Sequence, residues 1–425
     1  MKKLGLLLTA MILFTANAQN LQTVYKQDVI KLKAVESYAN NDWDKVFYDY
    51  NAQEYGTKSG KMKQLAIAPD GSVFMTNKFR YSISKFDKEG KYIKDFGKKG
   101  GKQASDFIYD PTVQGVIDGK YVYTVAVDGR MHFFDLNGNW VKTIKLDFMP
   151  LSTISLKNGK IAILGHIPMG NASKQILSIF DTNTRKQKVL TANTKSYSDA
   201  DKSRIVINPI EYTAKDGSKQ KGPTISCSLP FSDPMTSRER MGTDSKGNLI
   251  IGYPISGKIV IYTSEGVKIK EFQVDIPHSI ISKEEMERYY QNMEKKLNEM
   301  EKNVNIDNEE YRKQYIAQYR SQLEKFRNPA NYTSNLPCFA EMMIDSDDNI
   351  LLFNFTKEKG SNKFDVFTYN NDGNKIGTSS FASDQYDLIL NPSTFKFYKG
   401  QIIGYQELKN TKGNNMRLVK FDLVK

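Results

Sequence analysis

A polar turn followed by a β-rich run occurs six times along this 425-residue chain, and this repeat constrains the fold more than any other feature. Most of the turns contain a pair such as Asp-Gly, Asn-Gly or Asp-Asn, which supplies the positive φ angle that a tight hairpin needs. The residues that follow are rich in Val, Ile, Tyr and Phe, which suit the pleated, half-buried surface of a strand. The six copies are PDGSVFMTN from Pro69, IDGKYVYTV from Ile117, KNGKIAILG from Lys157, SKGNLIIGY from Ser245, SDDNILLFN from Ser346 and YKGQIIGYQ from Tyr398.

A second β-rich run ending in a polar turn follows the copies, as in KFDKEGKYIKDFG from Lys85 and FFDLNGNWVKTI from Phe133. The pattern therefore predicts four strands in each unit: three that precede the second turn and a fourth that follows it. One such antiparallel sheet cannot bury both faces alone, so repetition at roughly forty to fifty residues predicts copies that share a core. Six four-stranded sheets around a channel form a six-bladed β-propeller, the all-β fold that we expect for residues 19–425.

The sixth unit ends at Lys425 after its third strand, so another segment must complete its sheet. The segment TVYKQDVIKLKA from Thr23 has alternating apolar positions, Val29 or Ile30 and Leu32, that suit an outer strand. Pairing the two ends of the chain would close the ring and remove its last exposed sheet edges. We therefore predict that the segment from Leu21 to Ala34 closes the propeller.

The segment KDFGKKGGKQASDFIYDPTV, Lys94 to Val113, contains Phe-Gly, a glycine-rich gap, and then Phe and Pro before the next inner strand. In this pattern the chain resembles the exported six-bladed propellers of the NHL and TolB-like kind, a family abundant in Bacteroidota. The first two units carry the pattern best, and it is absent between the fourth and fifth units. The resemblance leaves two alternatives to a pure binding protein. One is a calcium-dependent lactonase or gluconolactonase with Ca²⁺ in the channel, and the other is a scaffold of an envelope transport system.

The first eighteen residues, MKKLGLLLTAMILFTANA, have the pattern of a secretory signal peptide. The apolar run from Leu4 to Phe14 is well below the roughly 20 residues that span a bilayer, so we predict no transmembrane segment. The first cysteine is Cys227, which leaves no cysteine near the cleavage site to carry a lipid anchor. We expect cleavage after Ala18 and export to the periplasm or the medium.

The formal net charge of +13 becomes +11 once Lys2 and Lys3 leave with the signal peptide. A basic surface favours anionic partners, but the most basic stretches also contain acidic residues and resemble no nucleic-acid-binding module. We therefore expect no nucleic acid. An exported compartment permits a disulfide between Cys227 and Cys338; the alternative is two buried thiols that never meet.

Two insertions interrupt the repeat. Residues 191–240 are rich in Lys, Ser, Thr and Pro and predict a long loop or irregular hairpin, with a strand-like stretch from Arg204 to Tyr212. Residues 279–330 change to a helical period, with capping boxes at Ser282 with Glu285 and at Asp307 with Glu310, and predict a helical hairpin. Its apolar stripes either pack on each other and on the propeller, or leave Met and Tyr side chains over for a protein partner. The candidate partner-binding residues are Tyr290, Met293, Tyr315 and Tyr319.

The sequence contains no recognisable catalytic motif. His132, His166 and His278 have no metal-ligand spacing, no nucleophile elbow or phosphate loop occurs, and DSDDN from Asp345 is better explained as a hairpin turn than as a calcium loop. We assign no catalytic residue, no metal ligand and no cofactor, with Ca²⁺ kept as the alternative. The leading hypothesis is an exported, non-enzymatic propeller that binds a protein or glycan through its channel face and helical insertion. Polar residues expected at the channel mouth are Arg80, Tyr81, Arg130, His166, Arg240 and Glu341.

Overall fold

The computed structural model describes seventeen stretches of the chain. They are residues 21–39, 64–77, 80–100, 105–109, 111–126, 128–169, 172–196, 204–207, 211–221, 225–228, 238–278, 282–303, 309–325, 337–354, 363–390, 392–409 and 416–424. The predicted signal peptide, residues 1–18, lies outside these ranges, so its cleavage stays a prediction. Among the helices in the described ranges, none is long and apolar enough to cross a membrane.

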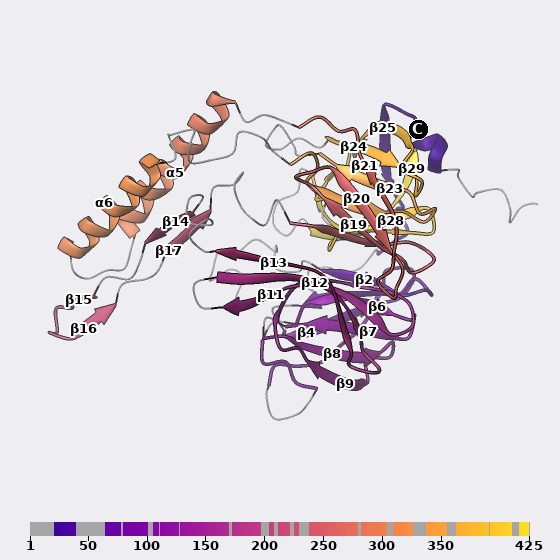
Figure 1. Cartoon of the computed structure of the whole chain (residues 1–425), viewed down its shortest axis with the longest axis horizontal. Coiled ribbons are helices and arrows are strands. Elements are labelled where there is room, and N and C mark those ends of the chain that lie inside the picture. Colours follow the sequence, from indigo (N-terminus) through magenta and orange to yellow (C-terminus); the bar gives the residue numbers. More distant parts are fainter. Residues whose placement is uncertain are drawn as a thin grey trace, which may run out of the picture.

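The described chain is mostly β-sheet, with four-stranded antiparallel units that follow one another along the sequence (Figure 1). Within each unit the strands pair in sequence order, which is the arrangement that the repeat predicts. The strands are β2 (Leu65–Ile67), β3 (Val73–Asn77), β4 (Ser82–Phe86), β5 (Tyr92–Phe96), β6 (Val113–Ile117), β7 (Tyr121–Val125), β8 (Arg130–Asp135), β9 (Trp140–Lys145), β10 (Met149–Ser155), β11 (Lys160–Met169), β12 (Ala172–Asp181), β13 (Gln187–Ser196), β18 (Arg240–Thr243), β19 (Leu249–Tyr253), β20 (Lys258–Tyr262), β21 (Lys268–Gln273), β22 (Glu341–Ile344), β23 (Ile350–Phe353), β24 (Lys363–Tyr369) and β25 (Lys375–Ala382).

The turns between first and second strands have the chemistry that the sequence predicts. Asp118 and Gly119, between β6 and β7, have φ angles of 51° and 64°, in the left-handed region that an Asp-Gly pair enters at low cost. In DSDDN, the Asp345 carboxylate accepts hydrogen bonds from the backbone N–H groups of Asp347 and Asn349, both at 2.8 Å. This sequence therefore forms the expected hairpin turn between β22 and β23.

The last unit contains strands from both ends of the described chain. They are β27 (Phe395–Tyr398), β28 (Gln401–Leu408), β29 (Met416–Val424) and β1 (Val29–Ala34), with the two-residue β26 (Tyr386–Asp387) paired to the end of β28. β1 pairs antiparallel with β29, where Leu32 lies opposite Leu423, and parallel with β25, where Ile30 lies opposite Phe381. Ile30 and Leu32 are buried while Val29 is 37% exposed, so Ile30 is the apolar position that faces the core.

A short helix, α2 (Leu21–Val24), precedes β1 and is also packed into the core. The hydroxyl of Tyr25 donates a buried hydrogen bond of 2.8 Å to Asp345 Oδ2, on the hairpin between β22 and β23. Burial raises the pKa of the Tyr25 phenol and of the Asp345 carboxyl. The N-terminal segment is therefore fixed to the preceding unit by a side-chain contact as well as by strand pairing.

Neighbouring units pack through their first strands and through the aromatic side chains between their faces. β2 contacts both β6 and β27, and further contacts join β6 to β10, β10 to β18 and β18 to β22. Between the first two units, for example, the rings of Phe96 and Phe134 lie 5.2 Å apart. This succession of four-stranded sheets in contact at their first strands is consistent with a propeller.

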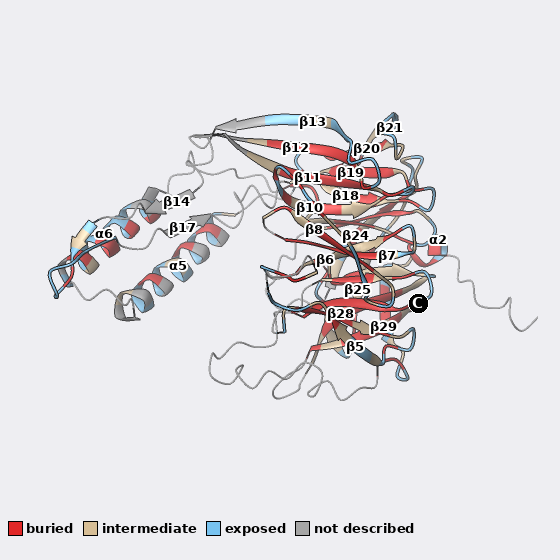
Figure 2. Ribbon diagram, turned by 90° about the horizontal axis from the view of Figure 1, so that it is seen from below, coloured by how far each residue is buried: buried red, intermediate tan, exposed pale blue. Residues whose placement is uncertain are grey.

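The two insertions contain regular structure. The 191–240 range, expected to be a long loop or irregular hairpin, has the last residues of β13 and two strand pairs, β14 (Arg204–Ile207) with β17 (Ile225–Ser228) and β15 (Glu211–Thr213) with β16 (Lys219–Lys221). The 279–330 range contains two helices, α5 (Lys283–Asn303), which begins directly after the predicted cap Ser282, and α6 (Glu309–Lys325). Both helices lie to one side of the sheets, beside β14 and β17 (Figures 1 and 2).

Candidate functional site

The chain leaves each unit and enters the next on the same side of the sheets, at the ends of the strands. We call this side the connection face. In a sheet of four antiparallel strands in sequence order, the first strand starts and the fourth strand ends on the same side. The connections between units therefore lie on that side, together with the turns between second and third strands. Both insertions leave the sheets there, on the side of Figure 2 where α5 and α6 lie. Functional residues of a rigid β scaffold are typically carried by such connections.

The residues expected at the channel mouth lie on the connection face, but most are engaged locally. Arg80 forms an ion pair of 3.0 Å with Asp95 of its own unit. The ammonium of Lys99 lies 4.4 Å from the ring centre of Tyr81. His166 lies near the end of β11, opposite Met149 of β10. Arg130 likewise pairs with Asp128 at 3.1 Å.

Arg240 and Glu341 are the two predicted residues that the structure joins directly. Arg240 Nε lies 3.0 Å from Glu341 Oε2 and donates to the carbonyl of Ala340 at 2.7 Å. Desolvation raises the pKa of the Glu341 carboxyl, and the Arg240 charge opposes this shift. Arg240 begins β18 after the first insertion and Glu341 begins β22 after the second, so this half-buried pair links the points at which both insertions re-enter the sheets.

The two insertions also contact each other and form one element, which we call the arm. It comprises the strands β14, β15, β16 and β17 and the helices α5 and α6. Tyr212 of β15 stacks on Tyr311 of α6, with ring centres 4.6 Å apart and an interplanar angle of 17°. α6 contacts β14 as well. Between the helices, Arg320 lies 2.9 Å from both Glu301 and Asn298. Segments separated by a complete four-stranded unit therefore fold as one body.

The candidate partner-binding side chains are mostly buried inside the arm. Tyr290, Tyr315 and Tyr319 are at most 5% exposed, and Met293 is half-buried. The hydroxyl of Tyr290 donates to Glu324 of the opposite helix. This burial supports the alternative in which the apolar stripes pack on each other, and it leaves polar side chains on the exposed faces of the helices.

Cys338 and His132 are buried and contact neighbouring groups of the protein. Cys338 is a free, buried thiol whose Sγ donates to the carbonyl of Pro254 at 3.0 Å, so the candidate disulfide with Cys227 is not formed in this structure. His132 is buried, with Nδ1 3.0 Å from Thr143 Oγ1 and its ring against Phe107. Among the described residues, no group of three or more His, Cys, Asp or Glu side chains is placed to hold a metal ion.

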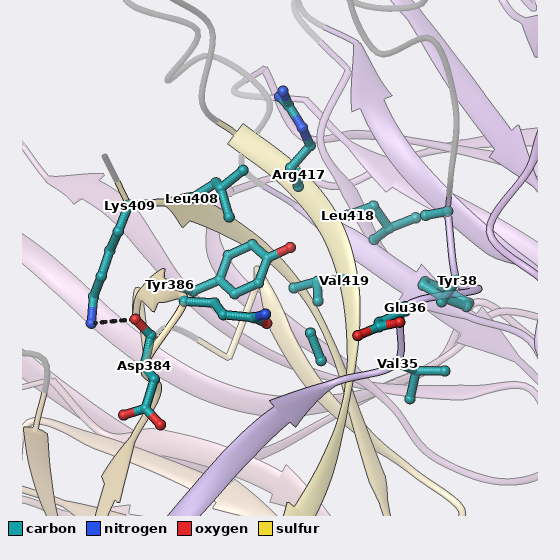
Figure 3. Close-up of a pocket in the computed structure, with 13 residues that line it drawn as sticks. Val35, Glu36, Tyr38, Asp384, Tyr386, Leu408, Lys409, Arg417, Leu418 and Val419 are labelled. Carbon is teal, nitrogen blue, oxygen red and sulfur yellow. Dashed lines mark hydrogen bonds between the residues drawn. The ribbon is translucent and has the colours of Figure 1, made fainter. Parts of the chain in front are cut away.

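A cavity of about 540 Å³ opens at the seam between the N-terminal strand and the last strands (Figure 3). Its volume lies within the range typical of small-molecule sites. The lining residues come from four separate segments: Ala34, Val35, Glu36, Tyr38 and Ala39; Asp384, Gln385 and Tyr386; Leu408 and Lys409; and Arg417, Leu418 and Val419. We call this space the seam cavity.

In Figure 3, Tyr386 lies between Glu36 on the right and Lys409 and Asp384 on the left. The Tyr386 ring packs edge-on against Phe421, with centres 5.4 Å apart, which fixes its orientation. Burial raises the pKa of the Tyr386 phenol, and the nearby Arg417 charge opposes the shift. The phenol therefore stays protonated and can donate a hydrogen bond at any physiological pH.

Sequence reasoning identified none of the lining residues as part of a site, including the polar Glu36, Gln385 and Tyr386. Glu36 and Gln385 lie in short connections and Tyr386 begins the two-residue strand β26, none within a motif, and they meet only because β1 pairs with β29. The one available signal was the prediction that the N-terminal segment joins the last unit, which by itself did not identify a cavity.

No protein-family model matches this sequence, and a search of curated proteins finds no match. Among solved structures, a member of the DUF4221 family from Bacteroides vulgatus is 11% identical, with 94% of this chain and 100% of that chain covered and a TM-score of 0.44. Virginiamycin B lyase from Staphylococcus aureus is 13% identical, with 93% and 100% covered and a TM-score of 0.40. A gluconolactonase from Xanthomonas campestris is 7% identical, with 85% and 86% covered and a TM-score of 0.38. At these identities and TM-scores no activity is transferred to this chain.

Proposed function

We propose that this chain is an exported, non-enzymatic six-bladed propeller that binds a protein partner through its arm. In this proposal the four-stranded units are the blades, β1 completes the sixth blade and closes the ring, and the helical hairpin is inserted between blades four and five. The signal-peptide pattern of residues 1–18 supports export. The pairing of β1 with β29 supports closure by the two chain ends.

The observation that carries the proposal is the stacking of Tyr212 on Tyr311, because it joins two separate insertions into one arm. The buried side chains of the helices lie within the arm, and the pair Arg240–Glu341 links the two insertions where they re-enter the sheets. A chain that builds such an element on the connection face presents a preformed surface at a fixed place. Preformed elements on a rigid scaffold are typical of recognition surfaces.

The charge of the arm favours a protein over an anionic polymer or an anionic membrane. α5 and α6 together contain nine acidic and nine basic residues. A nucleic-acid or anionic-lipid surface requires a clear excess of Lys and Arg, whereas mixed charges are common at the polar rim of protein interfaces. The exposed faces of the helices have this mixed character.

Site-specific photo-crosslinking tests the proposal in cells that express the full chain. A crosslinking amino acid at the exposed position Gln318 of α6 should yield a discrete adduct with one protein. The matched control is the exposed Lys91, on the hairpin between β4 and β5, at the opposite ends of the strands from the connection face. Absence of an adduct at Gln318, or the same adduct from both positions, would contradict the proposal.

A deletion gives a second, independent readout. Replacing residues 282–328 by a short Gly-Ser linker removes the crosslinking position, so the readout is co-purification of the partner identified at Gln318, which the deletion should abolish while the circular dichroism of the sheets is retained. Arg80→Ala serves as the control on the same face, since Arg80 lies in a β3–β4 connection away from the arm. Undiminished recovery after the deletion would place the binding surface elsewhere.

A further inference from the structure

The seam cavity contains charged groups that are already engaged with the protein. The ammonium of Lys409 donates to the carbonyl of Ser383 at 2.7 Å. The carboxylate of Asp384 lies 3.7 Å from the ammonium of Lys31. Arg417 donates to the carbonyl of Met416 at 2.8 Å. These cations are therefore partly satisfied before any ligand enters.

Four other polar side chains of the lining have no hydrogen-bond partner in the described part of the chain: Glu36, Tyr38, Gln385 and Tyr386. The Tyr38 hydroxyl is itself buried, so Glu36, Gln385 and Tyr386 are the three groups open to a ligand. A carboxylate only accepts hydrogen bonds, whereas an amide and a phenol can each donate and accept. A ligand that satisfies all three groups must offer several donors and acceptors close together. It must also present an apolar side to the Tyr386 ring and to Leu418 and Val419.

The charges around the seam cavity argue against an ionic ligand. The lining contains two cationic side chains, Lys409 and Arg417, and two anionic ones, Glu36 and Asp384, so the attraction of one pair for an ion is offset by the repulsion from the other. A neutral molecule with vicinal hydroxyl groups meets neither repulsion. Such hydroxyls donate to a carboxylate and accept from an amide, and the C–H face of a pyranose ring packs on an aromatic ring.

We propose that the seam cavity binds a neutral sugar, with the Tyr386 ring as the packing surface and with its hydroxyl, Glu36 and Gln385 as hydrogen-bonding groups. This inference goes beyond the arm-mediated binding proposed above and does not depend on it. The bound sugar would contact Glu36, after the first strand, and Leu418, within the last strand. It would therefore bridge the two ends of the fold and stabilise their pairing, because a ligand that binds only the folded state raises its stability.

The test uses the full chain without its signal peptide and a set of neutral trisaccharides: maltotriose, cellotriose, xylotriose, mannotriose and triacetylchitotriose. At least one should show saturation transfer in NMR at millimolar concentration and raise the melting temperature. Citrate and spermidine are the ionic probes, and neither should bind more tightly than the sugar. Failure of every trisaccharide to bind, or tighter binding of an ionic probe, would overturn the proposal.

Variants locate the site. Glu36→Gln, at an exposed position, and Tyr386→Phe should each weaken sugar binding, the first by about tenfold because it removes the charge from a hydrogen-bond acceptor. Asp372→Asn, on an exposed hairpin elsewhere, is the control that leaves binding unchanged. Equal affinity in the parent and both cavity variants would mean that the sugar binds elsewhere, which would also overturn the proposal. Both variants retain the arm, so their outcome is independent of the crosslinking experiment.

Discussion

At the scale of single residues, the Phe-Gly pattern after the fourth strand of the first unit has a steric explanation. Gly97 has a φ angle of 73°, and a Cβ added there would lie 2.3 Å from Cε2 of Phe107. Phe107 is itself 1% exposed and packs against Phe134 and His132. The glycine is therefore required both by the left-handed backbone and by the close approach of a buried ring.

Gly97→Ala should lower the free energy of unfolding by at least about 2 kcal/mol, because it adds left-handed strain to an overpacked contact. Gly400→Ala is a matched control, since Gly400 has a φ of 77° but nothing within 4 Å of its added Cβ. The control should lower the free energy of unfolding by about 1 kcal/mol, because only the left-handed backbone strain is added there. Equal losses in denaturant unfolding of the two variants would show that the contact with Phe107 adds nothing.

Lys396 is a charged residue in an otherwise apolar strand, where it lowers the stability of the fold. It lies on β27 opposite Ile403, between the partly buried Phe397 and the buried Phe395. Judged by its exposed surface, the side chain is half-buried, and the ammonium forms no hydrogen bond or ion pair with another described residue. Burial lowers the pKa of its ammonium from an ordinary 10.5 to about 8.

Replacing Lys396 by Met should raise the melting temperature at pH 7, since the ammonium is charged there and burial penalises its charged form. The pKa is lower in the folded chain, so the unfolded chain binds more protons between about pH 8 and 10.5. Stability of the parent should therefore rise with pH across this window, and the advantage of the Met variant should shrink. Thermal melts of both chains from pH 7 to 10.5 measure this, and a lower melting temperature for Lys396→Met at pH 7 would contradict it.

At the scale of elements, local patterns predicted the strands and helices well because their causes are local. The turn pairs such as Asp118-Gly119 fix a hairpin through backbone preference, and the helical period with a cap at Ser282 fixes the start of α5. Both signals act over a few neighbouring residues. A single sequence is sufficient to detect them.

The arm and the seam cavity could not be predicted in the same way because they depend on long-range contacts. The 191–240 range was expected to be a long loop or irregular hairpin, and no contact with the second insertion was predicted, yet Tyr212 in it stacks on Tyr311 of that insertion. Tyr315 and Tyr319 were candidates for a partner surface, yet both are buried. Neither result follows from spacing within one segment, since both depend on which distant segment supplies the other half of the contact.

At the scale of the whole molecule, the stability of the fold depends on where the N-terminal strand lies. β1 is hydrogen-bonded on both sides, to β25 and to β29, and so joins the last two units into one sheet. Its inward residues Ile30 and Leu32 belong to the same core cluster as Phe381 and Phe421. Removal of β1 would expose two sheet edges and part of this cluster together, which is costly because edge strands then lose their partners.

Deleting Leu21 to Ala34 should therefore lower the melting temperature markedly. It should also abolish the sugar-induced stabilisation, because it removes the lining residue Ala34 and the strand that holds the lining residues within 35–39 against β29. Single substitutions test the packing of β1 without removing the segment. Leu32→Ala should cost about 2–5 kcal/mol, as for other buried Leu side chains, while Lys31→Ala on the same strand, with a side chain 59% exposed, should change stability by less than about 0.5 kcal/mol. A deletion variant that melts like the parent would mean that the units hold together without β1, and the pairing of the two chain ends would then be a consequence of the fold and not one of its supports.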